Sequence, residues 1–265
     1  MEKDFLKIIV DHKKEELEFL KKKRPENLLR LNSQIKREIR PFYETLKKPN
    51  NMKSGKINII AEIKRASPSK GDIRLNLDPG KMAKDYEKGG ASAISILTDE
   101  KFFKGSADDF TIARKATRLP MLRKDFIISA YQVYDSFILG ADAILLIAKI
   151  LSREQLKDLL ALTHELKMSA LVEINSEKDF EKASNSGARL IGINNRNLNS
   201  FDTDISTATR LISLFNKDQV AVAASGISGK KDINKNCKAG IFNFLIGESL
   251  VKADNTVNFL KSLIE

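Results

Sequence analysis

From residue 57 onward, short apolar or β-branched runs alternate with longer amphipathic segments. The runs lie at residues 57–63, 91–98, 119–126, 141–148, 169–174, 188–194, 219–225 and 241–247. Strands that are apolar along their whole length are typical of a parallel sheet that is covered on both faces. Eight strand-then-helix units within about two hundred residues predict a (β/α)8 barrel, the TIM-barrel fold.

The intervening segments have the pattern of helices, at residues 79–90, 106–117, 129–140, 152–167, 176–187, 204–216, 228–240 and 248–265. Ser152 and Ser176 are suitable N-caps, and Gly140, Gly187 and Gly240 stand where helices end. A doubly wound open sheet is the alternative fold. It usually needs fewer strands, and no dinucleotide-binding fingerprint follows the first run, so the pattern favours the barrel.

Residues 1–50 precede this alternation and carry two helical patterns, interrupted at Pro25 and then at Pro41 and Pro49. Their apolar residues include Phe5, Leu6, Ile8, Ile9, Leu17, Phe19 and Leu20. We expect a single (β/α)8-barrel domain over residues 1–265, in which residues 1–50 form an N-terminal helical extension. The extension either packs on the barrel or covers the mouth of its active site.

The formal net charge of +11 raises the possibility of a nucleic-acid partner. The lysines are interleaved with glutamates, as in residues 13–23, which is typical of solvated helix faces, and there is no nucleic-acid motif. We therefore expect the charge to attract an anionic metabolite instead. The lack of a long apolar stretch or a signal-peptide core predicts a cytoplasmic protein with no membrane partner. One cysteine and two histidines do not suggest a zinc site.

Polar and charged residues stand at the ends of several apolar runs. Glu62 and Lys64 end the first run, Lys124 the third and Glu173 the fifth, while Asn194 ends the sixth and is followed by Arg196. In a (β/α)8 barrel, the carboxyl ends of the strands form the catalytic face. Side chains alternate along a strand, so Glu62 and Lys64 should face inward with Ile60. Two lysines and two glutamates would then meet at one end of the barrel.

Solvated ion pairs are the alternative explanation for these charges. We favour a catalytic site, because burying charges is costly unless they are paired or take part in function. A lysine next to another cation in a dry pocket has a lowered pKa and can donate a proton near neutral pH. Glycine turns at residues 225–228 and 246–249 follow the last two runs, and their backbone N–H groups are suited to surrounding a phosphate.

The sequence resembles the indole-3-glycerol phosphate synthase family of tryptophan biosynthesis. The matching segments are IAEIKRASPSKG, ISILTDEKFFKGS, LPMLRKDFI, GADAILLIA, LVEI, IGINNRNL, SGIS and LIGESLV, in the family's order and over essentially the whole chain. The resemblance implies a carboxy-lyase that converts 1-(2-carboxyphenylamino)-1-deoxyribulose 5-phosphate to indole-3-glycerol phosphate, CO2 and water. It also implies that the protein is a monomer and uses neither a cofactor nor a metal.

The resemblance further implies roles for individual residues. Lys124 is the general acid toward the ketone oxygen, Lys64 pairs with the substrate carboxylate, and Glu173 is the acid/base group in ring closure and dehydration. Glu62 positions the lysines, and Asn194 stabilises oxygen atoms along the path. Arg196 is implied to bind the carboxylate end of the substrate or to order the pocket. The other residues implied to bind substrate are Phe103 and Phe126 against the anthranilate ring, and Ser67, Ser225, Gly226, Gly247 and Glu248 around the phosphate.

One position departs from the family's pattern. Ala224 stands before the SGI turn, where the family usually has a glutamate. Because the lysines and Glu173 remain, we expect the activity to be retained. A catalytically weakened relative is one alternative. A phosphoribosylanthranilate isomerase is another, but its chemistry relies on a cysteine and an aspartate at strand ends, and Cys237 lies in a helical segment.

Overall fold

The computed structural model describes residues 5–47, 56–197 and 201–265. Eight parallel strands close into a barrel in the order β1-β10-β9-β8-β7-β6-β5-β4. They are β1 (Asn58–Ile63), β4 (Ala93–Leu97), β5 (Met121–Lys124), β6 (Ala143–Ile147), β7 (Ser169–Ile174), β8 (Leu190–Asn194), β9 (Val220–Ala224) and β10 (Asn243–Ile246). Each strand lies within one of the predicted apolar runs. The barrel prediction is therefore confirmed, and the open sheet is wrong.

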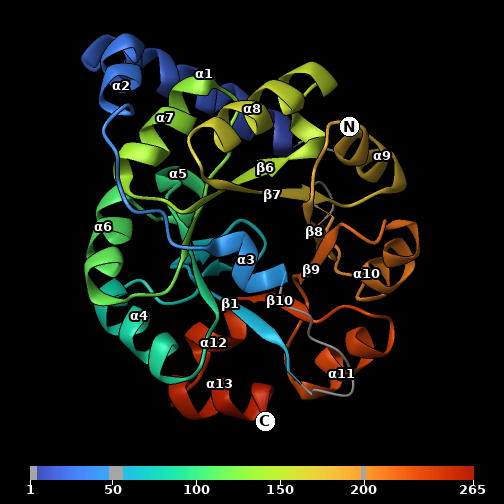
Figure 1. Cartoon of the computed structure of the whole chain (residues 1–265). Coiled ribbons are helices and arrows are strands. Elements are labelled where there is room, and N and C mark those ends of the chain that lie inside the picture. The colour runs from blue at the N-terminus through green and yellow to red at the C-terminus, as the bar shows by residue number, and fades with distance from the viewer. Residues whose placement is uncertain (1–4, 48–55, 198–200) are drawn as a thin grey trace.

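Helices surround the barrel (Figure 1). They are α4 (Pro79–Lys88), α6 (Ala107–Ala116), α7 (Ala130–Leu139), α8 (Arg153–Glu165), α9 (Glu177–Asn185), α10 (Ser206–Leu211), α11 (Lys230–Lys238), α12 (Glu248–Lys252) and α13 (Thr256–Ile264). The expected caps form: Ser152 and Gln155 make a capping box at α8, and Ser176 accepts a hydrogen bond from Asp179 N at α9. None of the helices among the described residues has the length and apolarity needed to cross a membrane.

Shorter elements complete the fold. They are α5 (Glu100–Phe103), the 3-10 helices η1 (Ala148–Ile150) and η2 (Ile212–Leu214), and the antiparallel pair β2 (Ala66–Ser67) and β3 (Gly71–Asp72). The expected helix over residues 204–216 is divided between α10 and η2. In the same way, the segment 248–265 forms two helices, α12 and α13, instead of a continuous one.

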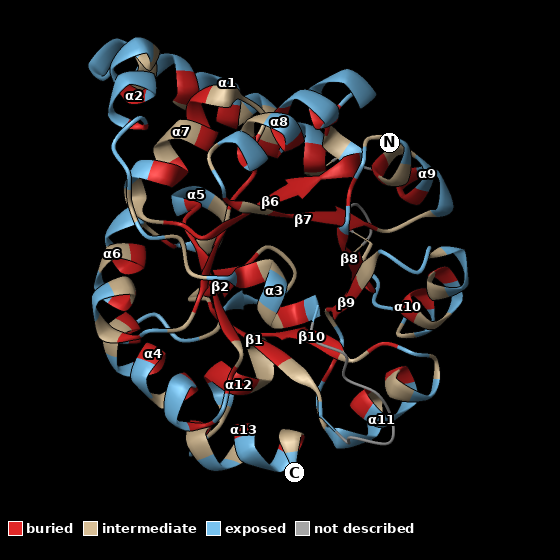
Figure 2. Cartoon of the chain, viewed as in Figure 1, coloured by how far each residue is buried: buried red, intermediate tan, exposed pale blue. Residues whose placement is uncertain are grey.

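The barrel strands are buried on both faces and separate two hydrophobic cores (Figure 2). Ile60 packs inside the barrel with Leu122 and Leu171. Its neighbours in β1, Ala61 and Ile63, pack against the surrounding helices. This alternation confirms the predicted direction of side chains along β1, which is what directs Glu62 inward.

The N-terminal extension contains three helices, α1 (Phe5–Lys23), α2 (Glu26–Asn32) and α3 (Phe42–Lys47), whereas two patterns were predicted. Leu6 and Ile9 of α1 join the inner core, as do Phe42 and Leu46 of α3. The two helices approach the core from opposite ends of the barrel. Of the extension predicted over residues 1–50, residues 1–4 and 48–50, including Pro49, lie outside the described residues.

A buried aspartate fixes the link between α2 and α3 at the amino ends of the strands. Asp142, just before β6, accepts hydrogen bonds from Arg40 N at 2.8 Å, Met121 N at 2.9 Å and Arg114 Nη2 at 3.0 Å. Nearby, the Tyr43 N–H donates to Ser169 Oγ at 3.2 Å. These contacts hold α3 against the end of the barrel that is opposite the cavity.

Candidate active site

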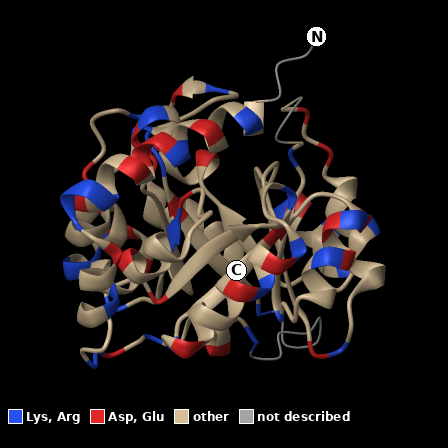
Figure 3. Cartoon of the chain, turned by 90° about the horizontal axis from the view of Figure 1, so that it is seen from above, with Lys and Arg blue, Asp and Glu red and all other residues tan. Residues whose placement is uncertain are grey.

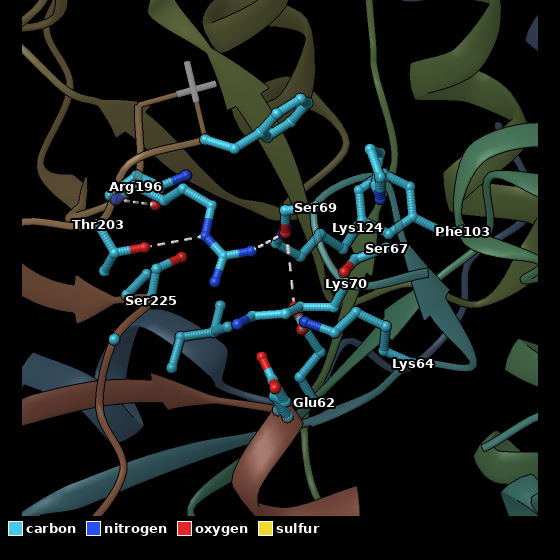
Figure 4. Close-up of a pocket in the computed structure, with 18 of the residues that line it drawn as sticks. Glu62, Lys64, Ser67, Ser69, Lys70, Phe103, Lys124, Arg196, Thr203 and Ser225 are labelled. Carbon is cyan, nitrogen blue, oxygen red and sulfur yellow. Dashed lines mark hydrogen bonds and ion pairs between the residues drawn. The ribbon is translucent and has the colours of Figure 1, made fainter. Parts of the chain in front are cut away.

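A cavity of about 490 Å³ lies at the carboxyl ends of the strands. Every site residue predicted from the sequence lines it, namely Glu62, Lys64, Ser67, Phe103, Lys124, Phe126, Glu173, Asn194, Arg196, Ser225, Gly226, Gly247 and Glu248. Figure 4 shows charged side chains that come from different strands and point toward one another. The closure of the barrel is what brings these distant parts of the chain to one place.

Glu62 lies between the two lysines of the cavity. Its Oε1 is 2.7 Å from Lys64 Nζ, and its Oε2 is 3.7 Å from Lys124 Nζ. Burial by itself would raise the pKa of Glu62, but the charges of Lys64 and Lys124 outweigh burial and lower it. Glu62 is therefore an ionised carboxylate that both lysines share.

A second carboxylate lies on the neighbouring strands β7 and β8. Asn194 Nδ2 donates a hydrogen bond of 3.1 Å to Glu173 Oε1, and both side chains are buried. The Oδ1 atom of Asn194 accepts a 3.0 Å hydrogen bond from Arg196 N, which orients the Asn194 amide. The amide of Asn194 therefore holds one oxygen of Glu173 in a defined position within the cavity.

Arg196 connects two loops across the mouth of the cavity (Figure 4). Its Nε donates to Thr203 Oγ1 at 3.2 Å, and its Nη1 donates to Ser69 Oγ in the turn between β2 and β3. Phe201 lies in the same loop as Thr203, and its ring is 5.1 Å from that of Phe5 in α1. The contacts of Arg196 order the mouth, while binding of a substrate carboxylate by Arg196 stays a prediction.

Two glycines allow the backbone to approach other groups closely. A Cβ atom at position 247 would lie 2.5 Å from Glu62 Oε1, so a side chain there would displace this carboxylate. Gly226 has φ +73°, and a Cβ there would lie 2.6 Å from Thr203 Cγ2. Both positions therefore favour glycine, whether or not a phosphate binds there.

Further polar residues on this side of the cavity were missed by sequence reasoning. They are Ser69, Lys70, Thr203 and Lys252, whereas Ser228 and Ser249 lie in the glycine turns that the sequence predicted. Lys252 Nζ is 2.7 Å from Glu248 Oε1. Burial would raise the pKa of Glu248, but the hydrogen bond and charge of Lys252 lower it. Lys70 lies in the motif IAEIKRASPSKG, and Lys252 directly follows LIGESLV, but neither lysine was assigned a role from the sequence.

Aromatic and aliphatic side chains form the opposite wall. The rings of Phe103 and Phe126 are 6.0 Å apart. Helix α1 adds Phe5, Leu6 and Ile9, which also line the cavity. Of the two expectations for the extension, coverage of the active-site mouth therefore agrees with the position of α1. The apolar pattern of α1 was evident in the sequence, but its partner was not.

Sequence reasoning also missed a buried ionic cluster beside the cavity. Only 1 % of Lys13 in α1 is exposed. Its Nζ lies 3.0 Å from Asp99 Oδ2, 3.0 Å from Asp125 Oδ1 and 2.9 Å from Glu16 Oε2. Lys13 had been assigned to a solvated helix face, and that interpretation is wrong for this residue. In Figure 3, lysines and arginines are interspersed with acidic residues on the outer helices, as the sequence suggested for most of them.

We expect Asp125 to make stability depend on acidic pH. Burial would raise its pKa, but Lys13 and Arg123 lower it from 3.8 to about 2. Because its pKa is lower in the folded state, the ionised carboxylate contributes about 2 kcal/mol near neutral pH. This contribution is complete above about pH 4 and is lost as the pH falls toward 2.

Urea unfolding between pH 7 and pH 3 measures this contribution. Asp125→Asn should lower the unfolding free energy at pH 7 and flatten its decline below pH 4. Asp158→Asn, at an exposed position of α8, should leave the curve unchanged. Parallel curves for the native chain and Asp125→Asn would contradict the assigned pKa.

A closed parallel barrel with an acid–base cavity at the carboxyl ends of its strands defines a (β/α)8-barrel enzyme. A family model described as indole-3-glycerol phosphate synthase matches residues 6–263. The chain belongs to this family.

Relatives of this family span almost the whole chain. The indole-3-glycerol phosphate synthase of Desulfosudis oleivorans is 53% identical over 261 residues and covers 98% of both chains. That of Syntrophobacter fumaroxidans is 46% identical over 250 residues, covering 94% of this chain and 93% of the relative. That of Legionella pneumophila is 44% identical over 259 residues, with 98% of both chains covered.

Solved structures of more distant proteins share the fold. Thiamine phosphate pyrophosphorylase from Pyrococcus furiosus aligns with a TM-score of 0.59 and 14% identity, over 80% of this chain and 96% of the other. N-acetylmannosamine-6-phosphate 2-epimerase from Clostridium perfringens aligns with a TM-score of 0.60 and 15% identity, over 81% and 93%. At such low identity, these similarities concern the fold alone.

Proposed function

We propose that the protein converts 1-(2-carboxyphenylamino)-1-deoxyribulose 5-phosphate to indole-3-glycerol phosphate, CO2 and water. Family membership supports this reaction, as does the presence of Lys64 and Lys124 around one ionised carboxylate in the cavity at the carboxyl ends of the strands. A substrate with a carboxylate at one end and a phosphate at the other requires cations in its binding site. The same lysines can also supply the proton that ring closure needs.

The first chemical step is the attack of the aromatic carbon on the ketone carbon. Lys124 donates a proton to the ketone oxygen as the new carbon–carbon bond forms, so no alkoxide accumulates. Lys64 pairs with the substrate carboxylate until CO2 leaves, and the bonding electrons then return to the ring. Glu62 supports both steps, because it is within 3.7 Å of the two ammonium groups.

The second part of the reaction is loss of water. Glu173 protonates the departing hydroxyl group or removes the proton that restores the indole, and Asn194 keeps its carboxylate oriented. Arg196 contacts the carboxylate end, and Phe103 and Phe126 enclose the anthranilate ring. The phosphate is bound by Ser67 of β2 and by the turns after the last two strands, through Ser225 and the backbone groups of Gly226, Gly247 and Glu248.

The proposal extends to the organisation of the protein. Residues 1–265 form one domain, in which the extension of residues 1–50 supplies part of the cavity wall. The protein acts as a monomer in the cytoplasm, and the reaction uses neither a cofactor nor a metal. A single peak at the monomer mass in light scattering would support the monomer, and a dimer mass would contradict it.

Conversion of the synthetic substrate tests the function. The native protein should form indole-3-glycerol phosphate, detected by indole fluorescence, and should release one CO2 per product molecule. Phosphoribosylanthranilate is the control substrate, and its isomerisation without indole formation would favour the alternative enzyme class. No turnover of either substrate by the folded protein would refute the proposal.

We expect Ala224 to be compatible with activity. It lies at the end of β9, is 5% exposed and lines the cavity, so no carboxylate comes from this position. Ala224→Glu should change kcat/KM by less than about tenfold, because Lys64, Lys124 and Glu173 stay in place. Ala224→Gln separates the effect of size from that of charge. An inactive native chain that gains activity in Ala224→Glu would show that the missing carboxylate is essential.

A further inference from the structure

The ionic cluster around Lys13 lies directly behind two segments of the cavity wall. Asp99 follows β4 and accepts hydrogen bonds from Phe102 N at 2.7 Å and Phe103 N at 3.2 Å. Asp125 follows Lys124 and accepts a 2.8 Å hydrogen bond from Phe126 N. Each aspartate therefore orders the backbone of a residue whose side chain faces the cavity.

Lys13 also connects these segments to α1. Leu6 and Ile9 precede it by seven and four residues, a spacing that places all three side chains on one face of the helix. Leu6 and Ile9 line the cavity, whereas Lys13 is not one of the described residues that do so. The ammonium thus joins α1, the end of β4 and the end of β5 at one point.

We propose that Lys13 is a positioning residue of the active site. Its buried ammonium draws Asp99 and Asp125 together and so sets the relative positions of Phe103, of Lys124 and of the wall formed by α1. Lys13 acts through these residues and does not touch the substrate. The inference rests on the proposed ring closure, because its readout is that reaction.

The electrostatics of the cluster show why an ammonium is needed at this point. Asp99 and Asp125 are 0 % and 4 % exposed and both face Lys13 Nζ. Other polar groups around the cluster are the Glu16 carboxylate and the His12 ring on α1, and the Arg123 guanidinium, whose Nη2 is 3.3 Å from Asp125 Oδ2. Arg123 also pairs with Asp135, at 2.7 Å. Without Lys13, two buried carboxylates would face each other with no ammonium between them, and their repulsion would drive them apart.

Such a change would affect catalysis more than binding. The substrate's anionic ends would still meet Lys64, Arg196 and the glycine turns. Lys124 and the aromatic wall would shift relative to them, and small misplacements of a catalytic group are costly in rate. We therefore expect kcat to fall while KM changes little.

The test compares Lys13→Met with Lys14→Met. Methionine keeps the length of the side chain but removes its charge, and Lys14 is the adjacent, exposed lysine, paired only locally with Asp11 at 3.4 Å. Lys13→Met should lower kcat by roughly 10- to 100-fold under conditions where urea unfolding shows it to be folded. Lys14→Met should stay within about twofold of the native chain.

A double variant distinguishes positioning from general destabilisation. Asp99→Asn removes the repulsion that Lys13→Met creates, and asparagine can still cap α5. The Lys13→Met, Asp99→Asn protein should therefore recover at least about a third of the lost factor in log kcat. If Lys13→Met alone fails to fold, the double variant is measured in its place, and its kcat should then be about 5- to 20-fold below that of the native chain.

Two results would overturn the proposal. One is a folded Lys13→Met protein with native kcat, and the other is a loss confined to KM. An inactive native protein would instead refute the proposed function, so the two failures are distinguishable.

Discussion

Lys124→Ala is expected to lower kcat/KM by roughly 10³-fold or more. The substitution removes the proton donor for the ketone oxygen, so the ring-closing step would have to generate a full negative charge. Glu62 keeps its partner Lys64 at 2.7 Å, so the variant retains a paired carboxylate in the cavity. We therefore expect the protein to stay folded while it loses activity.

Steady-state measurement of indole formation, with circular dichroism to verify folding, tests this expectation. Lys149→Ala is a matched control, because Lys149 also follows a barrel strand but is exposed and outside the cavity. Its activity should equal that of the native chain. If Lys124→Ala retained more than a tenth of the native kcat/KM, Lys124 would not be the general acid.

Glu173→Gln should reduce kcat by roughly 10²- to 10³-fold with little change in KM. Glutamine has nearly the same shape, and its amide oxygen can still accept the hydrogen bond that Asn194 Nδ2 makes to Glu173 Oε1 at 3.1 Å. Unlike a carboxyl group, the amide of glutamine cannot donate or accept a proton as a general acid or base. The substitution therefore removes acid–base chemistry and preserves the geometry of the cavity.

The comparison variant is Glu177→Gln on α9, where the carboxylate is exposed and pairs with Arg210 at 3.0 Å. It should leave both kinetic constants within about twofold of the native values. Glu173→Gln itself should keep the native KM and lose only kcat. A near-normal kcat in that variant would transfer the acid–base role to another group.

Local sequence pattern was enough to predict the barrel and the direction of its side chains. The alternation in β1 places Ile60, Glu62 and Lys64 on one face, and the packing of Ile60 inside the barrel agrees. The assignment holds because the period of a strand is a property of consecutive residues. Likewise, Ser152 caps α8 through residues only three positions away.

Contacts between distant segments were not predictable in this way. The sequence pattern of α1 suggested that Lys13 was solvated like its neighbours, but Asp99 and Asp125 surround it. Nothing local connects Arg196 to Ser69, which are 127 residues apart. Both contacts depend on which loops become neighbours when the barrel closes.

The sequence alone determined the barrel fold, the charged residues at the strand ends and the resemblance to a family. Each of these depends on periodicity or on motifs, which are properties of neighbouring residues. Only the tertiary structure decided that α1 covers the cavity, that Glu62 pairs with both Lys64 and Lys124, and that Lys13 is buried. The physical reason is that the energy of a charge depends on what surrounds it in space, and folding brings those surroundings from remote parts of the chain.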